Sequence, residues 1–373
     1  MFSELPKLFG KNFAVGFYLP TVAIACALSG IAIAHQHSDW LDKLRSEDPL
    51  KIAALSLIGI WLFAIGLMGL YRTVIRTLEG YGLCNPLRPL VRWQRHRFDC
   101  LRRDLEAKSK AAEKARDARD DALASGDLEH QTASLASAKR RAAAAEATLE
   151  AQPHNHRVRA RAVVARHRVV EAEEALRTLK EVLENAASAK VAADRRRREL
   201  VDRFPYNRHL VLPTRFGNAV RAFEVYSQVV YNLDSIPAWP RLLAVIPKDF
   251  SASIAEAEAN VSFWVNLWLG GILVAAADLA WTWIGNASSL PWSWAAALLF
   301  SWLAAICARL AIADWGALVK SAFDLFRADL AKQLGMKRPR TLARERELWS
   351  ALSAVMTYQQ EEAAAKLNDF RKK

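Results

Sequence analysis

Apolar and polar residues are distributed very unevenly along the chain, in four apolar runs and one long charged segment. The apolar runs cover residues 12–34, 52–71, 262–284 and 292–313, each close to the ~20 residues that a helix needs to cross a bilayer core. Residues 92–203 are instead rich in Ala, Arg, Glu, Asp and Lys and almost free of Gly and Pro. The pattern predicts an all-α fold, in which a four-helix transmembrane bundle carries a long soluble helical insertion.

The first apolar run has a second interpretation, as a signal peptide. Lys7 and Lys11 precede or open it, and Ala32-Ile33-Ala34 resembles a cleavage site. Its apolar core is longer than the usual ~7–15 residues of such peptides, which favours a membrane span. Pro20 should kink this span, because proline has no N–H to donate inside a helix.

Within residues 92–203, small and apolar residues recur at alternating spacings of four and three, which is typical of a coiled-coil seam. On the second arm the seam comprises Val158, Ala162, Ala165, Val169, Ala172, Leu176, Leu179, Leu183, Ala186, Lys190 and Ala193. A weaker seam on the first arm comprises Phe98, Leu101, Leu105, Lys108, Ala112, Ala115, Arg119 and Ala122. Residues 125–127 and 152–155 interrupt the pattern, and Pro153 marks the second break as a reversal. We expect a long antiparallel coiled-coil hairpin, whose second arm alone extends for ~70 Å.

The basic residues predict the orientation, because Lys and Arg are enriched in the cytoplasmic loops of membrane proteins. Arg72 and Arg76 follow the second span at once and Lys320 follows the fourth, whereas residues 285–291 carry no charge. Both termini and the hairpin should therefore face the cytoplasm. The expected segments are 1–91 with the first two spans, 92–203 with the hairpin, 204–261 as an interfacial collar, 262–314 with the last two spans and 315–373 with cytoplasmic C-terminal helices.

Other features of the composition agree with this organisation. Many of the 13 Trp residues stand near the ends of the apolar runs, where an indole prefers the membrane interface. The four cysteines, Cys26, Cys84, Cys100 and Cys307, form no C-x-x-C pair and have no His at ligand spacing. A disulfide framework or a zinc site is therefore not expected, and a reducing cytoplasm fits.

Basic residues gather at the expected end of the hairpin, and we call this set the basic tip. It comprises Lys139, Arg140, Arg141, Arg157, Arg159, Arg161, Arg166 and Arg168. The tip is either an ordinary solvated helix surface or a docking site for an acidic cytoplasmic protein or for nucleic-acid phosphates. No aromatic residue stands between the arginines as a stacking platform for single-stranded bases. A second cluster, Arg195–Arg198 with Arg203 and Arg88–Arg103, should meet anionic headgroups of membrane lipids.

The collar, residues 204–261, carries an irregular pattern of Pro, Gly and aromatic residues that suits the membrane interface, with Tyr and Trp half wet and Arg reaching headgroups. We expect it to fix the angle between hairpin and bilayer. Its motif P-T-R-x-G-N, then Y-x-L-D, then W-P-R-L resembles a segment of uncharacterised multi-pass membrane proteins of bacteria, over about 70 residues. The residues that carry the resemblance are Pro213, Thr214, Arg215, Gly217, Asn218, Tyr231, Leu233, Asp234, Trp239, Pro240, Arg241 and Leu242. The resemblance implies a bacterial inner-membrane protein and gives no activity.

Few polar residues interrupt the spans, and such residues are costly in a bilayer. Asp278 should be satisfied by Ser29 or Ser56, which lie at a similar depth, and is either a packing residue or part of an ion or proton path. Arg309 should pair with Asn266 or with a lipid phosphate. Stripes of small residues predict tight helix packing and a homo-oligomer. They comprise Gly271, Ala275 and Thr282 in the third span, Ala23, Ala27, Gly30 and Ala34 in the first, and Ser56, Gly59 and Gly66 in the second.

No motif of a known catalytic or cofactor-binding kind occurs, so the sequence predicts no enzyme, no catalytic residue, no cofactor and no metal. His35-Gln36-His37 beside Asp39 is the nearest to a metal site, but a solvated loop is the favoured interpretation. Two function classes remain. The chain is an integral membrane anchor or sensor whose hairpin engages a partner through the basic tip, or a homo-oligomeric channel or membrane-permeabilising effector gated by the hairpin and lined by Ser29, Ser56 and Asp278.

Overall fold

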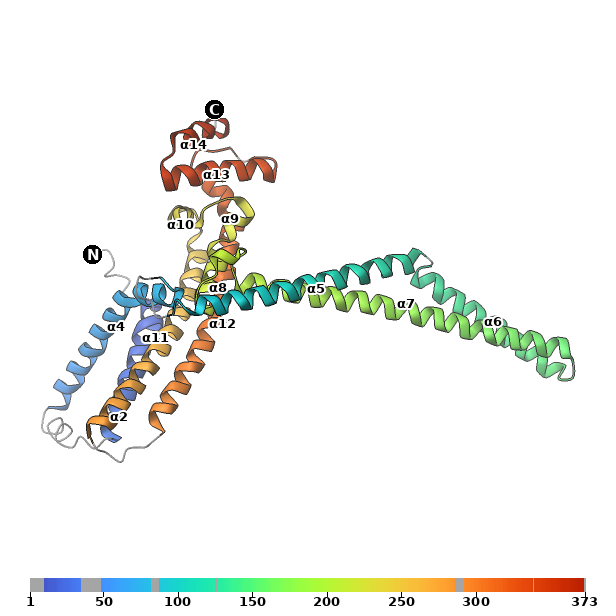
Figure 1. Cartoon of the computed structure of the whole chain (residues 1–373), viewed down its shortest axis with the longest axis horizontal. Helices are drawn as coiled ribbons and strands as arrows, with labels where there is room; N and C mark the ends of the chain where they lie inside the picture. Colours follow the sequence, from blue (N-terminus) through green and yellow to red (C-terminus); the bar gives the residue numbers. More distant parts are fainter. Residues whose placement is uncertain are drawn as a thin grey trace. The chain divides into compact units, whose positions relative to one another are not determined.

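The computed structural model describes residues 10–34, 48–81, 87–124, 126–285, 292–337 and 339–371, and all regular elements in these ranges are helical. The chain forms two compact units (Figure 1), one made of Met1–His96 with Val201–Lys373 and the other of Arg97–Leu200. Most residue contacts in the chain lie within one unit or the other.

Four described helices of the first unit are long and apolar enough to cross a membrane: Lys11–Ile33, Pro49–Glu79, Lys248–Trp283 and Ser293–Gln333. These are the four spans that the hydrophobic pattern predicts. The last two helices continue well beyond the apolar runs, as one unbroken helix in each case. The elements are α1 (Lys11–Phe13), the π-helix η2 (Ala14–Tyr18), α2 (Leu19–Ala34), α4 (Pro49–Glu79), α11 (Lys248–Gly285) and α12 (Ser293–Gln333).

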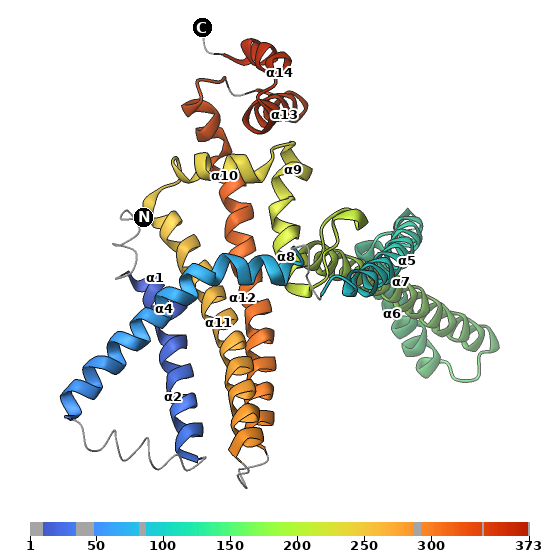
Figure 2. The same ribbon diagram turned by 60° about the vertical axis from the view of Figure 1, so that its left-hand side comes forward.

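Small residues decide which of these helices touch. A Cβ on Gly271 of α11 would lie 2.8 Å from the Ser301 Cβ of α12, so only glycine allows this approach. Both views show α2, α11 and α12 side by side, while α4 diverges from α2 along its length (Figure 2). A Cβ on Gly30, Gly59 or Gly66 would meet no described atom within 4 Å. These three glycines therefore pack against nothing in the described part of a single chain.

The sequence predicts a kink at Pro20. The structure has a π-helical turn, η2, that ends two residues before this proline. Pro20 has no N–H to donate to the Gly16 carbonyl, four residues earlier. The Asn266 amide of α11, which is 2% exposed, donates to that carbonyl instead, at 2.8 Å. One proline thus creates the acceptor that a buried amide in another span uses.

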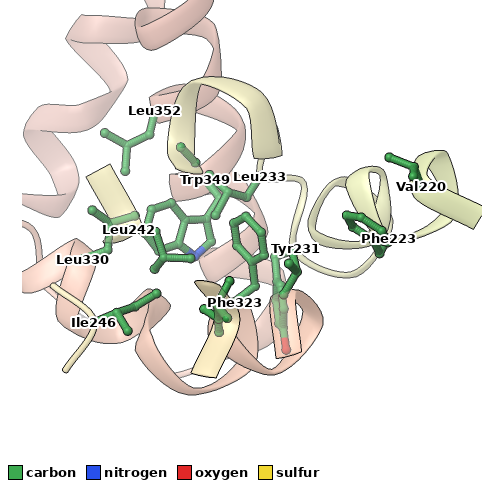
Figure 3. Close-up of a cluster of buried hydrophobic side chains, with 14 of the residues drawn as sticks. Val220, Phe223, Tyr231, Leu233, Leu242, Ile246, Phe323, Leu330, Trp349 and Leu352 are labelled. Atoms are coloured by element: carbon green, nitrogen blue, oxygen red, sulfur yellow. The ribbon is translucent and has the colours of Figure 1, made fainter. Parts of the chain in front are cut away.

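At one end of the spans, short helices pack around the extensions of α11 and α12. They are the 3₁₀-helix η3 (Arg208–Leu210), α8 (Arg215–Glu224), α9 (Tyr226–Tyr231), α10 (Ser235–Leu243), α13 (Leu342–Tyr358), α14 (Glu361–Lys366) and the 3₁₀-helix η4 (Leu367–Phe370). Their common core is built around Trp349, which has no exposed surface and lies among Leu242, Phe323 and Leu330 (Figure 3). We call this part of the first unit the cap.

Local signals in the sequence explain where the cap helices begin and end. Thr214, Asp234 and Thr341 accept hydrogen bonds from backbone N–H groups in the first turns of α8, α10 and α13. Asn232 ends α9 in the left-handed region, with φ 59°, and Gly335 follows α12 with φ 75°. The C-terminal helices pack on the collar, where the Ser353 hydroxyl accepts from the Asp234 N–H at 2.9 Å.

The second unit is made of parts of α5 (Leu90–Ala124) and α7 (His156–Arg203) with all of α6 (Leu128–Ala151). The two interruptions lie where the sequence predicts them. Asp127 caps α6 by accepting from the His130 N–H at 2.7 Å, and the Asn155 side chain accepts from the Arg157 N–H at the start of α7.

Ion pairs across the second unit show how its helices run. Lys139 pairs with Glu173 at 2.8 Å, Glu146 with Arg166 at 2.7 Å, and Asp104 with Arg196 at 2.5 Å. Because one partner's number falls as the other's rises, α7 runs antiparallel to α5 and α6, along which it lies in Figure 1. Every seam position named above is buried or half-buried except Lys190, which is exposed.

Candidate functional site

The P-T-R-x-G-N motif forms a joint between α8 and the end of α4. The Thr214 hydroxyl donates to the Leu78 carbonyl and also accepts from the Gly217 N–H, at 2.9 Å. A Cβ on Gly217 would lie 2.7 Å from the Glu79 Cα, so this glycine is required for the close approach of the two helices. Gly80 ends α4 with φ 92°, directly against the Pro213 ring.

Asn218 holds the joint from inside, with no exposed surface. Its amide group donates to the carbonyls of Leu212 and Thr214, at 2.9 and 2.8 Å, and its side-chain oxygen accepts from the Leu212 N–H at 2.7 Å. An asparagine has one acceptor oxygen and two donor hydrogens, so these bonds use both of its functions. The motif therefore has a structural role in fixing α8 against α4.

Other collar residues make contacts within the first unit, although Trp239 is half-buried and Arg215 and Arg241 are exposed, so the expected contacts with lipid headgroups stay a prediction. Tyr231 is buried, and the Trp239 ring packs 5.9 Å from the Phe323 ring. The Arg215 guanidinium lies 5.6 Å from the Trp93 ring centroid, and Arg241 donates to the Pro237 carbonyl of its own helix.

One acceptor in the cap is absent from the sequence-based expectations. Asp324 of α12 accepts hydrogen bonds from the Tyr226 and Tyr231 hydroxyls, at 3.0 and 2.7 Å. Burial and the bond to Asp324 raise the pKa of Tyr231 to about 12, so this hydroxyl remains a donor at neutral pH. The Arg327 guanidinium lies 4.0 Å from the Tyr231 ring centroid and pairs with Glu345 at 2.8 Å. The cluster joins α9, α12 and α13.

The intramembrane polar residues find different partners from those expected. Asp278 is 1% exposed and accepts a hydrogen bond from the Ser293 hydroxyl of α12. Ser29 and Ser56 are both exposed on their helices, and among the described residues neither hydroxyl hydrogen-bonds to Asp278. The expected pairing fails because depth in the bilayer does not determine which helix is the neighbour. The structure does not bring together the three residues of the suggested channel lining.

Arg309 and Asn266 do not pair either. The Asn266 amide bonds to Gly16, as described above, and the Arg309 Nε donates to the Ala305 carbonyl of its own helix at 3.2 Å. The carbonyl freed by Pro20 accepts from the Asn266 amide, whereas an arginine could only have donated to the Asn266 oxygen. Arg309 is half-buried, beside Trp268 and Trp302.

The basic tip lies on both helices that meet at the reversal of the second unit. Lys139 and Arg166 form the ion pairs described above, and Arg140 donates to the Ala136 carbonyl. Among the described residues, no ion pair engages the other five: Arg141, Arg157, Arg159, Arg161 and Arg168. All five are exposed, so the tip carries an uncompensated positive charge.

A groove of about 740 Å³ lies between α6 and α7 in this region. Arg141 on α6 and Arg161 and Arg168 on α7 line it, with Glu171 as its one acidic residue. Ser134 and Ser137 add hydroxyl groups to the same wall. Three guanidinium groups around one hollow form a surface that attracts carboxylates or phosphates.

The second basic cluster is partly neutralised within the second unit. Arg196 pairs with both Asp104 and Glu199, at 2.5 and 2.6 Å. The hydrogen bond from Lys108 and the charge of Arg196 hold the pKa of Asp104 below its ordinary value. Arg195, Arg197 and Arg198 remain exposed.

In the part of the chain that the structure describes, no group of three or more His, Cys, Asp or Glu side chains is placed to hold a metal ion. His35, His37 and Asp39 lie outside the described residues.

No protein-family model, no curated protein and no solved structure matches the chain. Its class therefore follows from its own structure: an all-helical protein with four helices long and apolar enough to span a membrane.

Proposed function

We propose that this chain is a non-enzymatic integral membrane anchor, whose α5–α7 region is an antiparallel coiled-coil hairpin that binds the acidic surface of a cytoplasmic protein. The observation that carries the proposal is the groove lined by Arg141, Arg161 and Arg168, none of which has an internal ion pair. The long helices give the tip its reach, since the 48 residues of α7 rise by about 70 Å.

A protein partner is favoured over a nucleic acid by the chemistry around the groove. Its lining has no aromatic side chain on which a base could stack. Glu171 also lies in the lining. Its charge would repel a phosphate backbone, which is negative along its whole length. It would repel a protein surface less, because neutral groups there separate the carboxylates. The serine hydroxyls offer donors and acceptors to such a mixed surface.

The orientation follows from the excess of basic residues after the second and fourth spans, which favours a cytoplasmic hairpin and cytoplasmic termini. Together with the resemblance of the collar motif, this supports a location in the inner membrane of a bacterium. The exposed Arg195, Arg197 and Arg198 would then interact with anionic headgroups, each contributing about 1 kcal/mol if it lies near the surface.

The unpacked glycines of the first two spans support a homo-oligomer, because Gly30, Gly59 and Gly66 leave room for the backbone of a helix from another copy. A homo-oligomeric channel is the alternative function, and it would need a water path shared between copies. Native mass spectrometry in nanodiscs separates the two: a closed ring of four or more subunits would favour the channel, and a dimer would favour the anchor.

The anchor proposal can be tested by fluorescence anisotropy with a labelled peptide rich in Glu and Asp. The variant R141Q/R161Q/R168Q should bind about tenfold more weakly than the wild type, because each exposed ion pair contributes up to about 1 kcal/mol. The matched control R102Q/R116Q/R177Q removes the same charge from exposed arginines of the same unit that already have acidic partners. It should bind like the wild type.

Equal binding by the triple variant and the wild type would overturn the proposal. A DNA duplex that binds more tightly than the peptide, with a steep loss between about 50 and 200 mM salt, would replace the protein partner by a nucleic acid.

A further inference from the structure

A second cavity lies in the first unit, where the end of α4 meets α8, α11 and α12. Its volume is about 440 Å³, within the range of about 300–1,000 Å³ that is usual for ligand sites. Phe223, Trp239, Trp315 and Phe323 form much of its apolar wall, and two of them, Phe223 and Phe323, are drawn in Figure 3.

Five charged side chains line the same cavity: Arg72, Arg76, Glu79, Glu224 and Glu258. Within the described residues, none of the two arginines and three glutamates forms an ion pair with another member of the set. Only Glu224 has an ion pair, with Arg221 at 3.3 Å. The charges therefore act on one another at a distance, Arg76 on Glu79 and Arg72 on Glu258, without closing into ion pairs.

Glu79 is the member that most needs a ligand. It is 9% exposed, and in the described part of the chain no hydrogen bond or ion pair reaches its carboxylate. The indole N–H of Trp315, in the same lining, is buried and also has no hydrogen-bond acceptor. The positive charges of Arg221 and Arg76 act on the Glu79 carboxylate only at a distance, so a cation that enters the cavity and hydrogen-bonds to it would offset more of the cost of its burial.

The cation should be an ammonium group rather than a metal ion. The carboxylates of Glu79, Glu224 and Glu258 do not come together as a set of metal ligands, since no such group exists among the described residues. A primary ammonium group donates hydrogen bonds in three directions, and aromatic rings such as those of Trp239 and Trp315 attract it further.

The arginines supply the complementary half of the site. Arg72 and Arg76 stand one helical turn apart on α4, so they lie on one face, and both are exposed. Guanidinium groups bind phosphate oxygens in a bidentate manner, at the entrance of a cavity whose interior holds the carboxylate. The group that fits both ends is a phosphate ester with a primary amine a few atoms away.

We propose that this cavity binds a phosphoethanolamine group, with its ammonium at Glu79 and its phosphate at Arg72 and Arg76. The source we favour is the headgroup of a membrane phospholipid, because Glu79 is the last residue of a helix long and apolar enough to cross the bilayer. The apolar wall then receives the first carbons of the lipid. The site is independent of the basic tip and of its partner.

The test is native mass spectrometry of the full chain in detergent, titrated with short-chain phosphatidylethanolamine, phosphatidylcholine and phosphatidylglycerol. The wild type should bind the ethanolamine lipid at least tenfold more tightly than the other two, because a choline has no N–H to donate and a glycerol has no positive charge. Glu79→Gln should lose that preference, and so should the double variant R72Q/R76Q. The control Glu362→Gln, on an exposed residue of α14, should keep it.

Thermal unfolding separates a loss of lipid binding from a loss of the fold in Glu79→Gln. Without lipid, Glu79→Gln should be at least as stable as the wild type, since it removes a buried charge, while the ethanolamine lipid should raise the Tm of the wild type alone. Soluble glycerophosphoethanolamine, if it binds as tightly as the lipid, would move the source from the membrane to solution. Equal binding of all three lipids by the wild type and Glu79→Gln would overturn the proposal.

Discussion

The two units of this protein are held together in different ways. The cap buries large and dissimilar side chains, among them Trp349, Phe323 and Leu242, and also contains a buried hydrogen-bond cluster around Asp324. The second unit buries mainly alanines along its seam and is bridged by ion pairs on its surface. Truncating an alanine of the seam removes little buried surface, whereas truncating a large side chain of the irregular core leaves a cavity.

The largest expected effect comes from the centre of the cap. Trp349→Ala should lower the free energy of unfolding by about 3–5 kcal/mol, because it leaves a cavity where an unexposed indole packs. Ala162→Gly, at a buried seam position of α7, should cost only about 1 kcal/mol through helix propensity. Chemical denaturation in mild detergent, followed by circular dichroism, measures both. Similar losses of stability for the two variants would show that the core of the cap and the seam of the second unit are equally sensitive to truncation.

An intermediate effect is expected at the joint between α8 and α4. Asn218→Leu should cost about 2–3 kcal/mol, because it leaves buried backbone groups of Leu212 and Thr214 without partners. Hydrogen exchange at the Leu212 amide should accelerate in the variant. The control Asn260→Ala, at an exposed position of α11, should leave that amide protected. Unchanged exchange in Asn218→Leu would mean that the joint does not depend on this side chain.

The smallest effects distinguish the units by the sign of their pH dependence. Burial raises the pKa of Glu224 in the cap, so the folded state binds its proton more tightly than the unfolded state does. Its destabilising contribution is absent below the ordinary Glu pKa and grows as pH rises through the folded value. Asp104 has a lowered pKa, so its stabilising contribution is present above the ordinary Asp pKa and is lost as pH falls toward the folded value.

Glu224→Gln should therefore stabilise the cap at neutral pH and not in acid, while Asp104→Asn should weaken the second unit at neutral pH and have little effect in acid. Hydrogen exchange at about pH 4 and pH 7 assigns each change to its unit. The same direction of change in both units would show that one of the two carboxylates has a different environment.

Sequence periodicity predicted the helices and their buried faces well. The seam of α7 holds at every named position but Lys190, and the breaks at residues 125–127 and 152–155 separate the helices of the second unit. The beginnings of α8 and α13 follow from Thr214 and Thr341, whose hydroxyls are ordinary N-caps. These features depend on neighbours a few residues away, which a sequence displays directly.

The partners of individual polar side chains were predicted poorly, because they depend on which helices are neighbours. Asp278 lies beside Ser293 and not Ser29 or Ser56, although all of them stand at similar depths. The same limit hid Asp324 and the cavity around Glu79. A glutamate at the end of an apolar span, followed at once by Gly80, was the one signal in the sequence that pointed to that site.

The bond between Asn266 and Gly16 has a consequence for biogenesis. The two residues are 250 positions apart, and translation delivers the N-terminal one first. The unused carbonyl beside Pro20 therefore already resides in the bilayer when the third span leaves the ribosome with an amide that hydrocarbon solvates poorly. We therefore expect the first span to act as a template that lowers the cost of inserting the third. The order of synthesis and the register of the bundle would then depend on the same proline.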